Sequence, residues 1–267
     1  FLVAKTPIHH GGDEKTGAER LLRRNKYIVD GNPVEIPYIS GNAIRGVLRR
    51  YVMADFLQQI GYSLSSAKLY HALFSGGVLE TVELKDSGVI DLQLKREINK
   101  YIIPLRVFGT SYKNQTIEGK LHVGLLLPLC KELKHYLPNV PKRYTSYLER
   151  TIYNFLDFKF QTRKDDLKAE RDDNEQAVQM IVEYEVFAPG TVFYHEFRVE
   201  DPDELDMACL YRCIELWKSV PYIGGKSALG FGELDIKYDI SSSQSYIESL
   251  RSNAEKIKEV LDRLQNL

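Results

Sequence analysis

The residues of this sequence that could do chemistry gather in a glycine-rich segment near the C-terminal end. The stretch "IGGKSALGFGEL", residues 223–234, combines closely spaced glycines with Lys226 and Ser227. Glycine lets the main chain approach a ligand closely, so bare N–H groups in such a loop can bind a phosphate. A tight connection between a helix and a strand would need the same glycines, and the segment alone leaves both interpretations open.

The loop does not fit the phosphate-binding motif of nucleoside triphosphatases. In that motif, Gly-x-x-x-x-Gly-Lys-Ser/Thr, the first glycine would fall on Val220, and a strand would precede the loop. Here the preceding residues are apolar at helical spacing, and those that follow alternate between apolar and polar. The loop therefore joins a helix to a strand, which argues against a triphosphatase.

A second candidate anion site lies at the start of a predicted helix over 41–60. Ser40 and Asn42 are both N-cap candidates, and Gly61 is a suitable stop. Arg45 and Arg49 are one turn apart and share a face. A helix start carries partial positive charge and unpaired N–H donors, so it can bind an anion. Two solvated arginines on a surface helix would give the same pattern.

The charge distribution favours a local site for a polyanion. The formal net charge is −1, so the whole chain is not a polycation. Basic residues nevertheless outnumber acidic ones between Glu19 and Arg50, and again between Gln93 and Asn114. A groove for a nucleic acid would concentrate cations in this way.

Other features exclude several classes of protein. No apolar run reaches the roughly 18 residues that span a bilayer, so we expect no membrane anchor. Cys130, Cys209 and Cys213 lack the spacing of a zinc site or a disulfide framework. We therefore expect reduced thiols in a cytoplasmic protein that holds no metal and no cofactor.

The predicted elements define an α+β chain. We expect a strand over 1–8, a polar basic loop up to Ile36, and the helix over 41–60. Residues 62–100 show no clear period, 119–129 read as a buried strand, and 131–154 as an irregular excursion. Apolar and polar residues alternate on both sides of Ala188-Pro189-Gly190, which predicts a hairpin. With a helix over 203–219 and a last strand, the order approaches the β-α-β-β-α-β plan of ferredoxin-like folds.

These segments resemble the RAMP superfamily of CRISPR-associated proteins. "IPYISGNAIRGVLRR" is similar to its Pro-x-x-x-Gly-Ser-x-(Ile/Leu)-(Lys/Arg)-Gly segment, and "IGGKSALGFGEL" to its C-terminal glycine-rich loop. Phe108-Gly109 followed by Gly119-Lys120-Leu121 resembles the "FG…GKL" stretch of its backbone subunits, and "NEQAVQMIVEYEVFAPGTVF" the strand pair after their thumb. The resemblance spans nearly the whole chain in the same order.

The resemblance implies a modified RNA-recognition-motif palm, residues 1–267, with a finger-like insertion at 62–104, a thumb at 157–178 and a C-terminal helix at 245–267. Such subunits form helical filaments along a CRISPR RNA, with copies of themselves and other effector subunits, and present the guide to target DNA or RNA. A subunit that holds any guide should grip phosphates and sugars. The residues expected to contact RNA are His10, Arg20, Arg24, Ser40, Gly41, Asn42, Arg45, Arg49, Arg163, Lys164, Met180, Gly224, Gly225, Lys226 and Ser227.

One departure from the family bears on catalysis. The RNA-cleaving type III backbone subunits carry an aspartate in the loop before the helix, and alignment on Tyr27 to Asp30 puts Arg24 in its place. The resemblance thus favours a backbone subunit without nuclease activity, of type IV first and type III second. Asp13 or Asp30 remains as a substitute for the aspartate if the cleaving type III alternative holds.

A different class of function is a metal-independent endoribonuclease that processes precursor RNA. His9 and His10 follow the first strand beside a basic stretch, and an imidazole could take the 2′-hydroxyl proton. No second acid–base residue is evident nearby in the sequence, and we favour the binding function.

Overall fold

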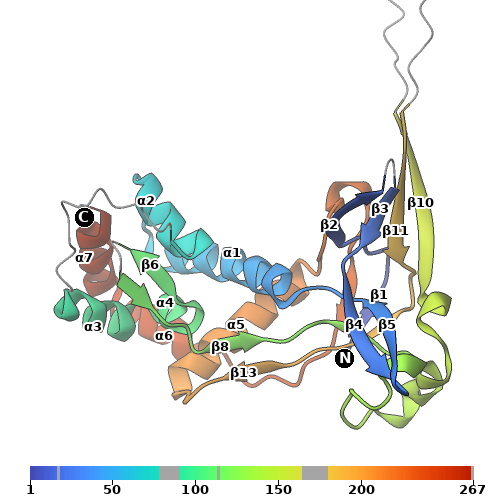
Figure 1. The fold of residues 1–267 in the computed structure, drawn as a ribbon. Helices are drawn as coiled ribbons and strands as arrows, with labels where there is room; N and C mark the ends of the chain where they lie inside the picture. The colour runs from blue at the N-terminus through green and yellow to red at the C-terminus, as the bar shows by residue number, and fades with distance from the viewer. Residues whose placement is uncertain (17–18, 78–90, 113–114, 164–179, 266–267) are drawn as a thin grey trace, which may run out of the picture. The chain divides into compact units, whose positions relative to one another are not determined.

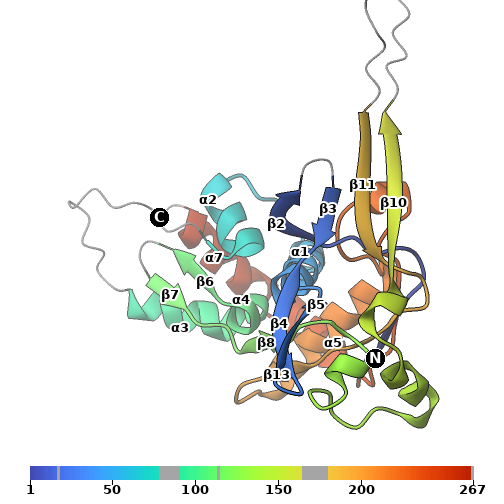
Figure 2. The same cartoon turned by 45° about the vertical axis from the view of Figure 1, so that its right-hand side comes forward.

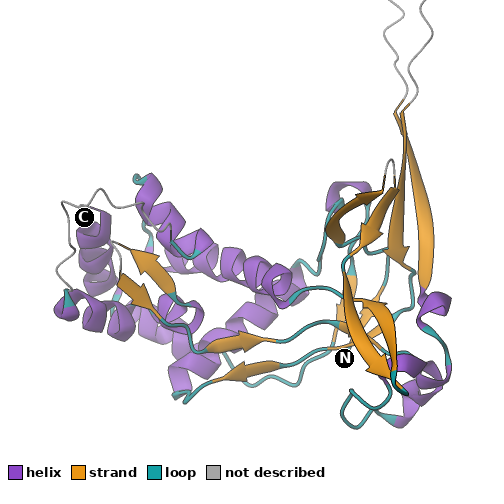
Figure 3. Ribbon diagram, viewed as in Figure 1, coloured by secondary structure: helices purple, strands orange, loops and turns teal. Residues whose placement is uncertain are grey.

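The computed structural model describes residues 1–16, 19–77, 91–112, 115–163 and 180–265 (Figure 1). The chain divides into two compact units. Unit 1 comprises 1–40, 125–195 and 221–237, and unit 2 comprises 41–124, 196–220 and 238–267. Strands dominate unit 1, whereas unit 2 holds the long helices (Figure 3). No helix within the described residues is long and apolar enough to cross a membrane.

The central sheet of unit 1 has the strand order β14-β1-β12-β9 and is antiparallel throughout. Its strands are β1 (Leu2–Ala4), β9 (Leu127–Pro128), β12 (Val192–Tyr194) and β14 (Leu234–Ile236). Helix α1 (Gly41–Ile60) follows β1 along the chain, and α5 (Glu204–Ser219) follows β12. This is the β-α-β-β-α-β order of a ferredoxin-like fold, as predicted.

A second sheet of unit 1 has the order β10-β11-β3-β2. Its strands are β2 (Gly11–Thr16), β3 (Glu19–Leu22), β10 (Leu156–Arg163) and β11 (Met180–Phe187), and Figure 2 shows β3 and β11 side by side. β10 and β11 pair over their whole length, from Leu156 opposite Phe187 to Arg163 opposite Met180. The predicted thumb, 157–178, takes in nearly all of β10, and its remainder, 164–178, lies outside the described residues.

The hairpin expected around Ala188-Pro189-Gly190 is wrong in its pairing. The turn is present, and Gly190 has a φ of 89°. However, β11 before the turn pairs with β10, whereas β12 after it pairs with β1 and β9. The chain therefore passes from one sheet to the other at this turn.

The polar loop expected before Ile36 is also wrong, because this region forms strands. β4 (Arg24–Val29) and β5 (Asn32–Pro37) pair antiparallel, with Val29 opposite Asn32. Asp30 and Gly31 form the turn between them, with φ of 50° and 80°. An Asp-Gly pair between strands is a strong signal for a two-residue hairpin turn, so the sequence did carry this information.

The rest of unit 1 is the excursion at 131–155. It consists of the 3-10 helices Lys131–Leu133, Lys142–Glu149 and Ile152–Phe155. Tyr144 is buried there against Leu129, which follows β9, and Val192 of β12. The expected irregular character is confirmed.

Helices α1 and α5 form the centre of unit 2. The predicted bounds of α1 are confirmed, and Gly61 ends it with a φ of 62°. Asp203 caps α5 in a reciprocal pair with Asp206. Arg212 of α5 donates to Asp55 of α1 at 2.6 and 3.0 Å, which joins the two helices.

Residues 62–104 contain more helix than the sequence pattern indicated. α2 (Ala67–Tyr70), a π-helical turn (His71–Ser75) and α3 (Leu92–Tyr101) lie here, and α4 (Ile103–Phe108) follows. Asp91 caps α3 by accepting from the amide of Leu94, and Leu94 and Ile98 are buried. Residues 78–90 lie outside the described part of the chain. Two short strand pairs complete this part of unit 2: β6 (Thr110–Tyr112) with β7 (Gln115–Ile117), and β8 (Leu121–Val123) with β13 (Phe197–Val199).

The C-terminal segment forms two helices instead of the single predicted one. α6 (Gln244–Ser252) and α7 (Ala254–Gln265) meet at Asn253. The side chain of Asn253 donates to the carbonyl of Ser249 at 2.8 Å, and such local bonds compete with a continuing helix. The residues expected to face inward, Leu250, Ile257, Leu261 and Leu264, are buried.

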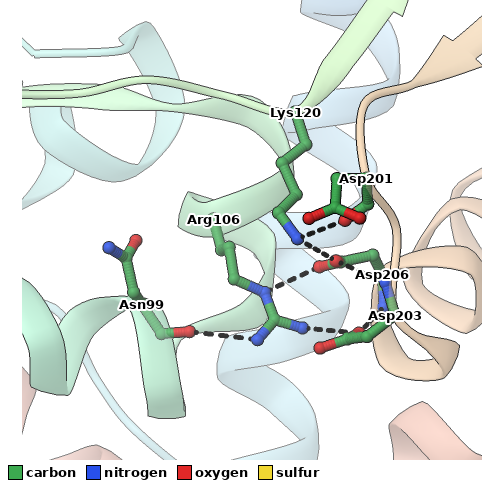
Figure 4. Close-up of polar contacts among 6 residues, drawn as sticks. All are labelled: Asn99, Arg106, Lys120, Asp201, Asp203 and Asp206. Carbon is green, nitrogen blue, oxygen red and sulfur yellow. Dashed lines mark hydrogen bonds and ion pairs between the residues drawn. The ribbon is translucent and has the colours of Figure 1, made fainter.

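A buried ionic network joins α4, the residue before β8 and α5 of unit 2 (Figure 4). Asp206 is fully buried and accepts from Arg106 Nε and Lys120 Nζ, each at 2.7 Å. Arg106 also donates to Asp203 at 2.8 Å. Burial alone raises the pKa of Asp206, but the hydrogen bonds from Lys120 and the Asp203 amide, together with the charge of Arg106, bring it below its ordinary value.

Candidate nucleic-acid interface

The glycine-rich loop lies against the residues that follow β1. The amide of Gly225 donates to the carbonyl of His9 at 2.9 Å, and that of Gly232 to the carbonyl of Pro7 at 2.9 Å. Gly224 has a φ of 82°, and a Cβ at this position would lie 2.5 Å from the His9 carbonyl oxygen. Only glycine satisfies both conditions at 224.

Consecutive amides of this loop are available to a ligand. Lys226 is left-handed with a φ of 65°, and the 3-10 turn Ser227–Leu229 follows it directly. The amides of Lys226, Ser227 and Ala228 donate no hydrogen bond to any residue that the structure describes. Ser227 and Ala228 are exposed. Successive N–H groups in a left-handed to right-handed turn form a concavity that binds anions.

The side chain of Lys226 is held on one face of the β10–β11 ribbon. Its Nζ donates to Gln161 Oε1 at 2.8 Å and lies 3.6 Å from the centroid of the Tyr184 ring. Phe231 of the loop packs on the same cluster, with Val182, Tyr184 and Val186. The loop is therefore anchored to the ribbon by its lysine and its phenylalanine.

The guanidinium of Arg24 is already paired within unit 1. It forms an ion pair with Glu185 and donates to the carbonyl of Leu22 at 3.1 Å. Glu185 is buried and also accepts from the amide of Leu22 at 2.9 Å. Arg20, in contrast, is exposed, and its backbone lies opposite Tyr184 in the parallel pairing of β3 with β11. Arg20 is thus the better candidate for contact with a polyanion.

His10 is engaged with the chain segment before α1. Its Nε2 accepts a hydrogen bond from the backbone amide of Ser40 at 3.2 Å. An amide can only donate, so Nε2 is unprotonated and the proton of the neutral ring is on Nδ1. Burial, followed by the charges of Arg23 and His9, lowers the pKa of His10 to about 4. Neither ring nitrogen of His10 is then free to act as a base.

In unit 2 the start of α1 is tightly packed. Gly41 is buried, and any Cβ there would collide with the carbonyl oxygen of Val123. Asn42 is exposed in the first turn of the helix. Asn42 therefore lies within the helix. It was one of the two candidates for the N-cap, and it is not the N-cap.

Arg45 and Arg49 share a face as predicted, but that face packs inside unit 2. Arg45 donates to the carbonyls of Leu121 and Phe108, and Arg49 donates to that of Gly109. Both guanidiniums lie over the ring of Phe108. Arg49 is 7% exposed, and burial, then the charge of Arg45, lowers its pKa to about 10. This arrangement fixes α1 to the Phe108-Gly109 turn.

The structure thus groups the expected site residues within each unit. Unit 1 brings the loop residues Gly224, Gly225, Lys226 and Ser227 to the segment after β1 that carries His9. The backbones of Arg163 and Met180 pair at the end of the ribbon, but their side chains and all of Lys164 lie outside the described part. Sequence reasoning missed Gln161 and Tyr184, which are set by the pairing of two strands distant along the chain. Among described residues, no cluster of His, Cys, Asp and Glu is placed to hold a metal ion.

The strand order and the inserted segments define a ferredoxin-like α+β protein with a modified RNA-recognition-motif palm. A family model of the RAMP superfamily matches residues 1–235, and the chain belongs to this superfamily. A solved structure titled "Type IV-B CRISPR Complex" is similar over 90% of this chain and 91% of that chain, with 21% identity and a TM-score of 0.58. A search of curated proteins found no match. The predicted superfamily and fold class are confirmed.

Proposed function

We propose that this chain is a CRISPR RNA-binding backbone subunit of an effector complex, of the type IV class, without nuclease activity of its own. Membership of the RAMP superfamily and the similarity of fold to a type IV-B CRISPR complex support this class. The observation that carries the proposal is the row of unused amides at Lys226, Ser227 and Ala228 on a loop that also bears a lysine.

These groups suit a strand of any sequence. Backbone amides and a lysine recognise phosphate, which is the same at every nucleotide, and they leave base edges free to pair with a target. Arg20 adds a positive charge on β3 of the same unit. In unit 2, the exposed side chain of Asn42 is a separate candidate contact. Copies of the chain bind side by side along the guide, together with other subunits of the complex. Target DNA or RNA then binds through the guide.

The observations at two residues argue against two of the candidates for cleavage. His10 offers no free ring nitrogen as a general base, because the Ser40 amide occupies Nε2. Arg24, at the position that the family resemblance assigns to a catalytic aspartate, pairs with a buried glutamate. The precursor-RNA endoribonuclease would then have to use His9, the other histidine considered for it, and the type III alternative would have to use Asp13 or Asp30.

The proposal is tested with the full-length protein and RNAs of increasing length. We expect assemblies whose mass, measured by light scattering, rises stepwise with RNA length. RNA complementary to a bound guide should remain intact with and without divalent metal. Monomers at low salt in the presence of RNA would overturn the binding function, and cleavage lost on Asp13→Ala or Asp30→Ala would replace it with the type III alternative.

A further inference from the structure

The ring of His9 is held in one orientation inside unit 1. It is 7% exposed, and its Nδ1 lies 2.7 Å from the carbonyl oxygen of Glu185. The Tyr184 ring contacts it edge-on, with centroids 5.3 Å apart and planes at 75°. A carbonyl oxygen can only accept, so Nδ1 carries the proton and Nε2 presents a lone pair.

Nothing in the described chain uses that lone pair. Nε2 has no hydrogen-bond partner among the described residues. It is not among the fully buried polar atoms that lack a partner, so solvent reaches it. Gly11, which is exposed, lies beside it, and a Cβ on Gly11 would be 3.1 Å from Nε2. Glycine at 11 therefore keeps the approach to Nε2 open.

This acceptor is next to the amides of the glycine-rich loop. The carbonyl of His9 accepts from Gly225, one residue before the row of unused amides. Burial is the main cause that lowers the pKa of His9 below its ordinary value. The positive charges of Lys226 and Arg20 lower this pKa further. The ring is therefore neutral at physiological pH, and Nε2 remains an acceptor among donors.

An acceptor in this position cannot bind phosphate, which has only acceptors at neutral pH. The group of a nucleic acid strand that can donate from the sugar is the ribose 2′-hydroxyl, and it is also what distinguishes RNA from DNA. We infer that His9 Nε2 accepts a hydrogen bond from a ribose 2′-hydroxyl of the strand whose phosphate binds the amides of Lys226 to Ala228. The loop then grips any strand, and His9 makes the site select RNA. This inference rests on the proposed function.

The test compares binding of three oligonucleotides of one sequence to the full-length protein: RNA, 2′-fluoro RNA and DNA. The 2′-fluoro strand keeps the sugar conformation of RNA and lacks the donor. We expect the wild-type protein to bind RNA about 2- to 10-fold more tightly than 2′-fluoro RNA, the range for one hydrogen bond. His9→Asn keeps a donor near Nδ1 for Glu185 but removes Nε2, and should bind the two strands equally.

Two further variants test the same preference for RNA over 2′-fluoro RNA. Gly11→Ala narrows the approach to Nε2 and should reduce the preference in the same direction. His135→Asn replaces an exposed histidine of unit 1 and should leave the preference unchanged. Equal wild-type affinity for RNA and 2′-fluoro RNA, or a preference that persists in His9→Asn, would overturn the role of His9 and leave the binding function standing. Failure of the wild-type protein to bind any of the three strands would overturn both.

Discussion

The ammonium of Lys226 lies 3.6 Å from the centroid of the Tyr184 ring and donates to Gln161 at 2.8 Å. The aromatic face and the amide oxygen hold a left-handed residue of the glycine-rich loop on the β10–β11 ribbon. Neither partner is a carboxylate, so neither carries a negative charge that would offset the charge of this lysine. The charge is thus available to a phosphate bound at the neighbouring amides.

The first prediction concerns this charge. Lys226→Ala should weaken RNA binding equally for all sequences and flatten the slope of log affinity against log salt by about 0.7, the value for one phosphate contact on a single strand. Titration at several salt concentrations measures the slope. Lys134→Ala, at an exposed lysine of unit 1, is the control and should leave the slope unchanged. A loss that depends on base sequence would contradict a phosphate contact.

The second prediction concerns two of the exposed glycines of the loop, Gly224 and Gly230. Gly224→Ala should destabilise the loop and lower RNA affinity, because the new Cβ would lie 2.5 Å from the His9 carbonyl oxygen. Gly230→Ala is the matched control: its φ is also 82°, but nothing lies within 4 Å of its Cβ. The free energy of unfolding of the Gly230→Ala control should fall only by the cost of backbone strain, about 1–2 kcal/mol. Equal melting temperatures and affinities for the two variants would contradict the packing at Gly224.

The third prediction follows from the protonation of His10. Its pKa is about 4 in the folded chain and has an ordinary value of 6.5. Between these values the unfolded chain binds more protons, so the free energy of unfolding should fall as the pH is lowered through this window. The expected loss is smaller than the roughly 3 kcal/mol that the full shift would give, because His10 is only partly buried and solvent screens its charge. Urea unfolding at pH 7, 6, 5 and 4 measures it.

The control for this titration is His10→Gln, which does not titrate and keeps an acceptor for the Ser40 amide. The other histidines and the carboxylates contribute equally to both proteins, so the difference in slope isolates His10. Parallel curves for the two proteins would show that the Ser40 contact does not depend on a neutral imidazole.

The fourth prediction tests the ionic network of unit 2. Asp206→Asn should lower the free energy of unfolding by about 3 kcal/mol, since it leaves Arg106 and Lys120 partly buried without their shared carboxylate. Glu259→Gln breaks an ion pair in which both side chains are more than half exposed. Its effect should be much smaller than that of Asp206→Asn, because solvent screens an exposed ion pair. Denaturant unfolding of both variants distinguishes them, and similar losses would contradict a structural role for the buried network.

The sequence predicted the elements whose signals are local. The bounds of α1 follow from its apolar spacing and from Gly61, and the strands and helices of the ferredoxin-like order follow from their periods. The β4–β5 hairpin was missed, although Asp30-Gly31 is a local signal, because the surrounding residues are polar and basic. The order of family motifs was sufficient to identify the superfamily.

What could not be predicted depends on contacts between segments far apart along the chain. The spacing of Arg45 and Arg49 puts them on one face of α1, but it does not show that the carbonyls of Phe108 and Gly109 meet that face. Likewise, Lys226 meets Tyr184 only because β10 pairs with β11. A pattern within one segment does not determine which other strand will pair with that segment.

The most direct test of the account is to sequence the nucleic acid that copurifies with the full-length protein from cells that contain a CRISPR array. We predict short RNAs with repeat-derived ends, bound by several copies of the chain, and much less RNA when Gly224→Ala replaces the wild type. A protein that purifies free of nucleic acid at low salt, or that carries RNA without repeat-derived ends, would contradict the central claim that this chain binds guide RNA.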